Sequence, residues 1–192
     1  MTSFSLVLLV LITTWPLELI LPLTGMKGKH IPEIASNAQR VSSVYTSILD
    51  GGCHLQQSDE MGSELICPGV SGYKLKIVDF DNRMTVSVID PRGREHPLNF
   101  QDTITRGFST LGKKAEWRVV RKNGALIPIA LIIRVNQDEI NGIGEVSYLS
   151  VSKISRSEIC VTDRINPTVN QNSQARRAAD AAASKPCRPS VP

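Results

Sequence analysis

Apolar and polar residues alternate along the middle of the chain, which is the pattern of half-buried β-strands. In residues 73–79 lysines alternate with apolar side chains, and residues 83–90 repeat the alternation. Asp81 and Asn82 stand between the two runs, and both residue types favour tight turns. The pattern therefore predicts two strands joined by a hairpin turn at this pair.

The strongest hairpin signal is Asn123-Gly124, which lies between the β-rich runs at residues 116–122 and 125–135. Both turn residues readily adopt the positive φ of a type I′ turn, whose twist matches that of the flanking strands. Pro128 lacks a backbone N–H and cannot donate to a sheet ladder. The second strand is therefore expected to be an edge strand or to bulge at this proline.

The first strand of this hairpin carries the candidate binding residues. Glu116 and Arg118 project from one face of the strand and Trp117 from the other, where we expect it to anchor the core. In the register of an unbulged two-residue turn, Trp117 pairs with Ala130 and Arg118 with Ile129. The charged pair is expected to stabilise its own face, and the alternative is that Glu116 and Arg118 mark a recognition surface.

Other segments complete the predicted architecture. The pattern predicts strands at residues 143–155 and 158–162 and a polar loop at 50–64. Residues 41–49 suit a short helix or a strand, and the helix is favoured. Residues 173–184 are rich in alanine and favour a helix. Strands followed by a terminal helix predict an α+β fold, in which an antiparallel sheet of about five to seven strands is packed by the C-terminal helix.

The C-terminal helix has two distinguishable faces. Arg176 and Asp180 are spaced to pair with each other at i and i+4 on a solvated face. Another face consists of small residues that would pack closely on the sheet: Ala175, Ala178, Ala179 and Ala182.

The N-terminal residues 5–23 are almost entirely apolar, which suits a membrane or a translocon. No basic residue precedes this run, whereas Lys27 and Lys29 follow it, which is opposite to the usual polarity of an export signal. A cleaved signal peptide is favoured over an uncleaved anchor, and both are favoured over a cytosolic location. The chain thus divides into a leader or anchor at 1–25, a linker at 26–40, a single α+β domain at 41–187 and a tail at 188–192.

Composition changes this picture little, since 41% hydrophobic and 21% charged residues are typical of a globular protein. The net charge of +4 is scattered along the chain. A nucleic-acid-binding protein would concentrate its basic residues on one face and interleave them with aromatic residues. We therefore expect no nucleic-acid partner.

The four cysteines are Cys53, Cys67, Cys160 and Cys187. An even number of cysteines after an apolar leader favours two disulfides and an exported protein, and the close Cys-x-x-Cys pairs of zinc sites are missing. Cys53 and Cys67 bracket a polar loop, and the terminal helix leads back from the last strand to Cys187. These features favour Cys53–Cys67 and Cys160–Cys187, with a link from Cys53 to Cys187 as the open alternative.

Candidate catalytic groups are sparse. Ser71 lies in a glycine-rich segment that favours a turn and lacks the spacing of a nucleophile elbow. Asp79 and Asp81 would suit an acid pair, but a hairpin turn in which an aspartate pairs with Arg83 is favoured. No metal or cofactor is expected, because none of the three histidines is spaced as part of a ligand pair. They are His30, His54 and His96.

Three short motifs carry a resemblance to known proteins. They are Cys-Pro-Gly-x-x-Gly-Tyr at 67–73, Glu-Trp-Arg at 116–118, and Ala-Arg-Arg-Ala-Ala-Asp at 175–180 ahead of Cys187. Over roughly residues 41–187 the chain resembles a family of small secreted or periplasmic bacterial proteins that has no assigned activity. The resemblance implies export and a disulfide framework, and it supplies no catalytic residues. The leader departs from the family pattern because it lacks basic residues and an alanine-rich cleavage site.

The sequence therefore predicts a periplasmic or secreted, non-enzymatic binding or accessory protein. Its partner would be an unknown protein or a ligand of the cell envelope, and only an uncleaved N-terminal segment would contact a membrane. The alternative is an envelope hydrolase with a dispersed active site. A deep pocket holding a histidine or paired carboxylates would favour the hydrolase, whereas a flat sheet surface would favour binding.

Overall fold

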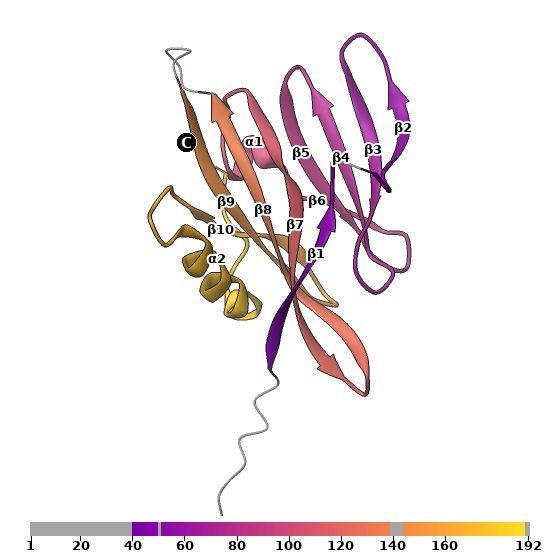
Figure 1. The fold of residues 1–192 in the computed structure, drawn as a ribbon, viewed down its shortest axis with the longest axis vertical. Helices are drawn as coiled ribbons and strands as arrows, with labels where there is room; N and C mark the ends of the chain where they lie inside the picture. Colours follow the sequence, from indigo (N-terminus) through magenta and orange to yellow (C-terminus); the bar gives the residue numbers. More distant parts are fainter. Residues whose placement is uncertain (1–39, 50, 139–143, 191–192) are drawn as a thin grey trace, which may run out of the picture. The chain divides into compact units, whose positions relative to one another are not determined.

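The computed structural model describes residues 40–49, 51–138 and 144–190 (Figure 1). The predicted leader, and the predicted linker apart from Arg40, lie outside these residues. None of the helices in the described ranges is both long and apolar enough to cross a bilayer.

Ten strands in the described ranges form one sheet, with the order β10-β9-β8-β7-β5-β4-β3-β2, while β1 pairs with β7 and β6 with β5 (Figure 1). The strands are β1 Val41–Ser47, β2 His54–Ser58, β3 Gly62–Pro68, β4 Lys74–Phe80, β5 Arg83–Ile89, β6 Glu95–Pro97, β7 Ser109–Lys122, β8 Ala125–Asp138, β9 Glu145–Ile154 and β10 Ile159–Ile165. The helical segments are α1 Phe100–Thr103, α2 Gln171–Asp180 and the 3-10 turn η1 Ala182–Ser184.

The expected α+β class is wrong, because the described chain is largely β. The sheet has ten strands rather than about five to seven. It is also mixed rather than antiparallel, since β5 and β7 meet in parallel at Arg83 and Ser109. The C-terminal helix packs on the sheet as predicted, but it begins at Gln171 and ends at Asp180.

Two of the additional strands lie where a helix and a loop were expected. The apolar residues of β1, Val41 and Val44, are three apart and imitate a helical period, yet the whole segment pairs antiparallel with β7. Every residue of β2 is exposed, so no alternation of burial marks it as a strand. Its pairing with β3 alone places β2 at the edge of the sheet.

The Asn123-Gly124 hairpin is confirmed. Asn123 has φ 51° and Gly124 has φ 79°, and β7 pairs antiparallel with β8 around them. The expected bulge at Pro128 is also present, since Val119 pairs with Pro128 whereas Arg118 pairs with Ala130. The bulge shifts the register by one residue, so both expected pairings, Trp117 with Ala130 and Arg118 with Ile129, were wrong, and Trp117 pairs with Leu131 instead.

The Asp81-Asn82 turn is confirmed as well, with φ 51° and 55° between the antiparallel strands β4 and β5. Asp81 pairs with Arg83 across this turn, as predicted.

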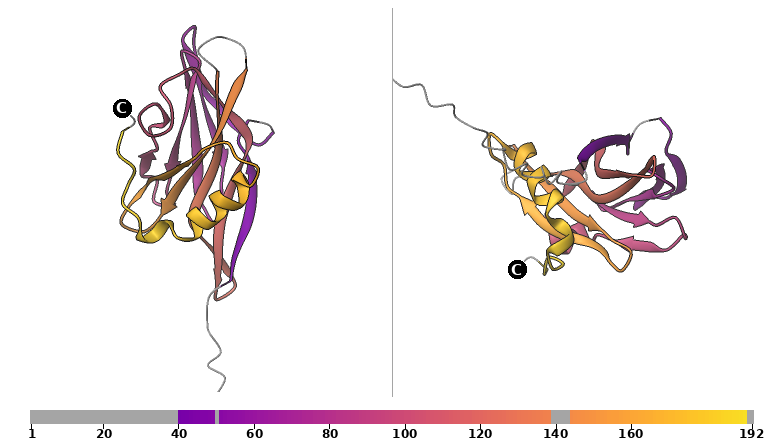
Figure 2. Two further views of the ribbon diagram at one scale, coloured as in Figure 1. Left: turned by 90° about the vertical axis from the view of Figure 1, so that its left-hand side faces the viewer. Right: turned by 90° about the horizontal axis from the view of Figure 1, so that it is seen from below.

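The sheet curls, so strands from both of its ends contribute to one main core (Figure 2). This core includes Ile77 of β4, Val86 of β5 and Val161 of β10, with Trp117 fully buried at its centre as predicted. A second apolar cluster lies between the outer side of β8–β9 and α2. There the helix contributes only small residues, as predicted, and the cluster comprises Ala130, Ile132, Leu149, Val151, Ala175, Ala179 and Ala182 with Ala178 beside it.

Both predicted disulfides are present. Cys53, which directly precedes β2, bonds Cys67 of β3. Cys160 of β10 bonds Cys187, which follows α2 and η1. No free cysteine occurs among the described residues. Two disulfides are compatible with an extracellular location, since the cytosol keeps most thiols reduced.

Candidate functional site

The two residues singled out by the sequence, Glu116 and Arg118, lie beneath α2. Arg118 donates from Nε and Nη2 to the carboxylate of Asp180 at 2.7 and 2.9 Å, which is a two-pronged ion pair. Glu116 accepts from Nε of Arg176 at 2.7 Å. Arg176 and Asp180 therefore pair with β7 and not with each other, so the predicted i, i+4 pair on a solvated face was wrong.

The geometry of helix and strand explains this cross-pairing. Residues two apart on a strand are separated by about 7 Å and lie on one face. Residues four apart on a helix are separated by about 6 Å along the axis and also share a face. Glu116 and Arg118 on β7 thus match Arg176 and Asp180 on α2 in both spacing and charge.

The charges of this cluster are neutralised within the chain. The Ser43 hydroxyl donates to Glu116 and accepts from Arg118, both at 2.5 Å, and so links the two ion pairs. Burial alone would raise the pKa of the Glu116 carboxyl. Hydrogen bonds from Arg176 and Ser43 outweigh burial and lower that pKa below its usual value. Glu116 and Arg118 both bind side chains of the chain itself. Their predicted role in binding a ligand stays a prediction.

A hollow of about 150 Å³ lies beside Glu116, between α2 and the sheet. Its lining mixes both charges with Tyr45, and its Arg134 is already bound to Ser147 and Asn172. This hollow therefore resembles an incompletely filled polar interface more than a site selective for one charge.

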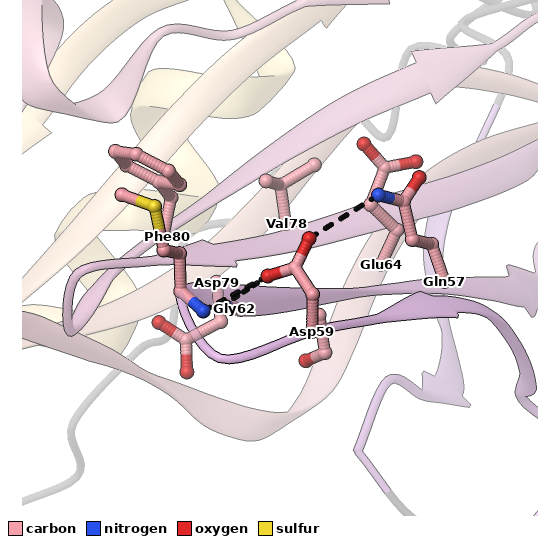
Figure 3. A pocket seen from close by; sticks show the side chains of 9 residues that line it. Gln57, Asp59, Gly62, Glu64, Val78, Asp79 and Phe80 are labelled. Atoms are coloured by element: carbon pink, nitrogen blue, oxygen red, sulfur yellow. Dashed lines mark hydrogen bonds between the residues drawn. The ribbon is translucent and has the colours of Figure 1, made fainter.

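A different site emerges at the end of the sheet where the β2–β3 hairpin meets β4 (Figure 3). A groove of about 210 Å³ opens there, and the side chains of Met61 and Phe80 form part of its wall. These two large apolar residues are 62% and 54% exposed, respectively. Val78 of β4 and Glu64 of β3 also line the groove (Figure 3).

Asp59 shapes the groove by holding the hairpin turn. Its Oδ1 accepts from the backbone N–H groups of Met61 at 2.9 Å and Gly62 at 3.1 Å, as Figure 3 shows. Hydrogen bonds lower the pKa of the Asp59 carboxyl. The largest effect comes from the Met61 N–H, and smaller ones come from the side chain of Gln57 and the Gly62 N–H. Gly62 is required by contact, because a Cβ there would lie 2.0 Å from the carbonyl oxygen of Asp79.

Carboxylates dominate the rim of the groove. A second hollow of about 470 Å³ shares Asp59 and Asp79 with the groove and adds Glu60 and Asp81, the latter paired with Arg83. Oδ1 of Asp79 is buried and accepts no hydrogen bond from the described residues. Sequence reasoning assigned Asp79 and Asp81 to a turn and missed the groove, because β2 and β3 were not recognised as strands that would bring Met61 beside Phe80.

The remaining candidate groups do not converge on a catalytic arrangement. Ser71 lies in a turn with φ 53°, and its hydroxyl donates to the carbonyl oxygen of Leu126 at 2.6 Å. His54 lies on the exposed strand β2, and His96 lies 3.5 Å from Asp90. His30 lies outside the described residues.

One group of potential metal ligands occurs in the described ranges, namely Glu158 with Cys160 and Cys187. The two cysteines are joined as a disulfide, so neither offers a thiolate to a metal.

Comparison of the chain with protein-family models, with curated proteins and with solved structures gave no match.

Proposed function

We propose that the chain is a periplasmic or secreted binding protein that takes a basic segment of a partner protein into the groove at Met61 and Phe80. The observation that carries this proposal is the exposure of two large apolar side chains beside carboxylates that lack a cation. Among the described residues, Asp59, Glu60 and Glu64 form no ion pair.

The groove suits both the apolar stem and the charged end of a lysine or arginine side chain. The methylene stem of such a side chain is apolar and can lie on Met61 and Phe80. Its charged end can reach the acidic rim or the face of the Phe80 ring. Because the whole chain carries a net charge of +4, an acidic rim is a local departure that would select basic partners.

The location is supported by chemistry elsewhere in the chain. Both cysteine pairs are oxidised, which favours an extracytoplasmic compartment. The apolar run at 5–23 and the resemblance to a secreted or periplasmic family point in the same direction.

The alternative, an envelope hydrolase, gains less support from this groove. A general acid needs a carboxyl group that holds its proton near neutral pH. Asp59 is the reverse case, since two backbone N–H groups stabilise its charged form. A carboxylate held in this way is suited to attract a cation and to fix a turn.

A peptide-binding experiment tests the proposal. A short fluorescent peptide of alternating lysine and valine should bind the exported form, whereas its aspartate counterpart should not. The substitution Phe80→Ser should weaken lysine-peptide binding about tenfold, because it removes the apolar support of the cation. Glu64→Gln should weaken binding and make it less dependent on salt.

Matched controls come from exposed residues outside the groove. Leu55→Ser removes an equally exposed apolar side chain, and Glu145→Gln removes an exposed carboxylate from β9. Neither change should affect binding. Equal binding of the two peptides, or no effect of Phe80→Ser, would overturn the proposal. Sedimentation that shows a dimer dependent on Phe80 would assign the groove to a second copy of the chain instead.

A further inference from the structure

A second charged hollow lies at the opposite end of β4 from the groove. Tyr73 directly precedes β4, and Phe80 ends it. Since a strand rises about 3.3 Å per residue, roughly 20 Å separates the two ends. The hollow has a volume of about 180 Å³ and is lined by Tyr73, Asp90, Pro91, Arg92, Arg94, Ser155 and Arg156.

Three turns from distant parts of the sequence build this hollow. Arg92 and Arg94 lie in the turn between β5 and β6, Arg156 lies in the turn between β9 and β10, and Tyr73 ends the turn after β3. The like charges of three guanidinium groups repel one another, so bringing them to one hollow is unfavourable until an anion joins them.

The Asp90 carboxylate offsets only part of this positive charge. Its Oδ1 accepts from the backbone N–H groups of Arg92 and Arg94 at 2.9 and 3.0 Å. Its Oδ2 accepts from Nε of Arg94 at 2.9 Å. Burial would raise the pKa of Asp90, but these hydrogen bonds outweigh burial and lower it to about 2. Asp90 is therefore a carboxylate at physiological pH, and the lining keeps a net charge of +2.

The arrangement leaves two guanidinium groups for a ligand. Within the described ranges, the side chains of Arg92 and Arg156 form no ion pair, whereas Arg94 is fixed by Asp90. The neighbouring acidic groups are engaged elsewhere, because Glu95 pairs with Lys76 and Glu158 with Lys153.

The turns that carry these arginines are held in place. The N–H of Asp90 donates to the carbonyl oxygen of Arg94 at 2.9 Å, and the N–H of Gly93 donates to that of Asp90 at 2.8 Å. In the other turn the Ser155 hydroxyl donates to the carbonyl oxygen of Glu158 at 2.7 Å and accepts from its N–H at 2.9 Å. Binding an anion here would require little reorganisation of the backbone.

We propose that this hollow is a binding site for a phosphate group, held between the guanidinium groups of Arg92 and Arg156. Planar guanidinium groups match the oxygens of a phosphate with paired hydrogen bonds, and two of them can share one phosphate. The Tyr73 hydroxyl, at the wall of the hollow, can add a donor. The phosphate can belong to a free small molecule or to the headgroup of a phospholipid.

The test uses the exported form with two probes. Inorganic phosphate is titrated by calorimetry, and vesicles of phosphatidylglycerol are compared with vesicles of phosphatidylcholine by co-sedimentation. Saturable binding of phosphate identifies a site for free phosphate compounds. Binding to phosphatidylglycerol vesicles without measurable binding of phosphate identifies a lipid headgroup site. Failure of both probes overturns the proposal.

Substitutions locate the site. Arg92→Gln and Arg156→Gln should each weaken binding about tenfold, because each removes one charge-assisted contact. Lys122→Gln removes the same charge from the exposed tip of the β7–β8 hairpin and should leave the affinity unchanged. An equal loss in Lys122→Gln would overturn the proposal, since it would mean attraction to the net charge alone. Circular dichroism of the variants checks that neither substitution of an exposed arginine unfolds the sheet.

Discussion

Charged side chains lie on the outer side of the sheet in two regions, and only one region neutralises them within the chain. In the helix-covered region, formed by β7–β9 and α2, Glu116 and Arg118 meet opposite charges on the helix. In the open region, formed by β2–β4, carboxylates stand beside exposed Met61 and Phe80. The comparison separates charges that hold the fold together from charges that remain available to a ligand.

The largest expected effect concerns the covalent ties of the two regions. Replacing both Cys160 and Cys187 by serine should lower the free energy of unfolding by about 3 to 4 kcal/mol in the chain-entropy model, for a separation of 27 residues. Replacing Cys53 and Cys67 should lower it by about 3 kcal/mol, for a separation of 14. Urea unfolding followed by tryptophan fluorescence measures both.

The position of the damage should also differ between these variants. Hydrogen exchange in α2 should accelerate when Cys160 and Cys187 are replaced, because the segment after β10 loses its covalent anchor. It should stay slow when Cys53 and Cys67 are replaced. Equal acceleration in both variants would mean that the two regions are a single cooperative unit.

The second largest effect is expected from removing an ion pair between β7 and α2 in the helix-covered region. Arg118→Met should lower the free energy of unfolding by about 2 kcal/mol, because it removes the charge-assisted hydrogen bonds to Asp180 and the hydrogen bond to Ser43, while the carboxylate of Asp180 is exposed enough to be hydrated. The control Arg177→Met changes an exposed arginine on α2, the helix that carries Asp180. It should lower the free energy of unfolding by less than about 0.5 kcal/mol. Comparable losses in the two variants would contradict the assignment.

A smaller effect depends on pH. Glu116→Gln should lower the free energy of unfolding by about 1 to 2 kcal/mol at neutral pH. The pKa of Glu116 is lowered in the folded state, so its contribution is complete above the usual value of 4.5 and is lost as pH falls through the folded pKa. The stability difference between the variant and the parent should therefore shrink in acid. A difference independent of pH would exclude the ionised carboxylate as its source.

The smallest effect is expected in the open region. Phe80→Ser and Met61→Ser should each change the free energy of unfolding by less than about 0.5 kcal/mol, since both side chains are largely exposed. A loss above 2 kcal/mol would show that the groove stabilises the fold, and the contrast between the two regions would fail.

Local chemistry made part of this structure predictable. Asn123-Gly124 specifies its turn by conformational preference alone, and Pro128 specifies a bulge because it lacks a donor. The Cys53–Cys67 pairing followed from the polar loop that the two cysteines bracket, and the Cys160–Cys187 pairing from the terminal helix that leads back from the last strand. Each of these predictions depends on residues that are close in sequence.

Features that depend on distant contacts were not predictable in this way. β1 is a strand because it pairs with β7, although its own apolar spacing suggests a helix. Arg176 and Asp180 satisfy the rule for pairing along a helix, but the strand beneath them offers better partners. The groove depends on the edge strand β2. All residues of β2 are exposed, so it lacks the alternation of apolar and polar residues by which a strand is recognised.

The matched charges on β7 and α2 also bear on the order in which the protein can fold. Arg118 and Asp180 are 62 residues apart in sequence, so β7 is synthesised well before the helix that covers it. Until α2 docks, Ile132, Leu149 and Val151 remain uncovered on the strands. A nascent chain would therefore expose an aggregation-prone surface until α2 has been synthesised and docks. A chain truncated before Gln171 would expose that surface permanently.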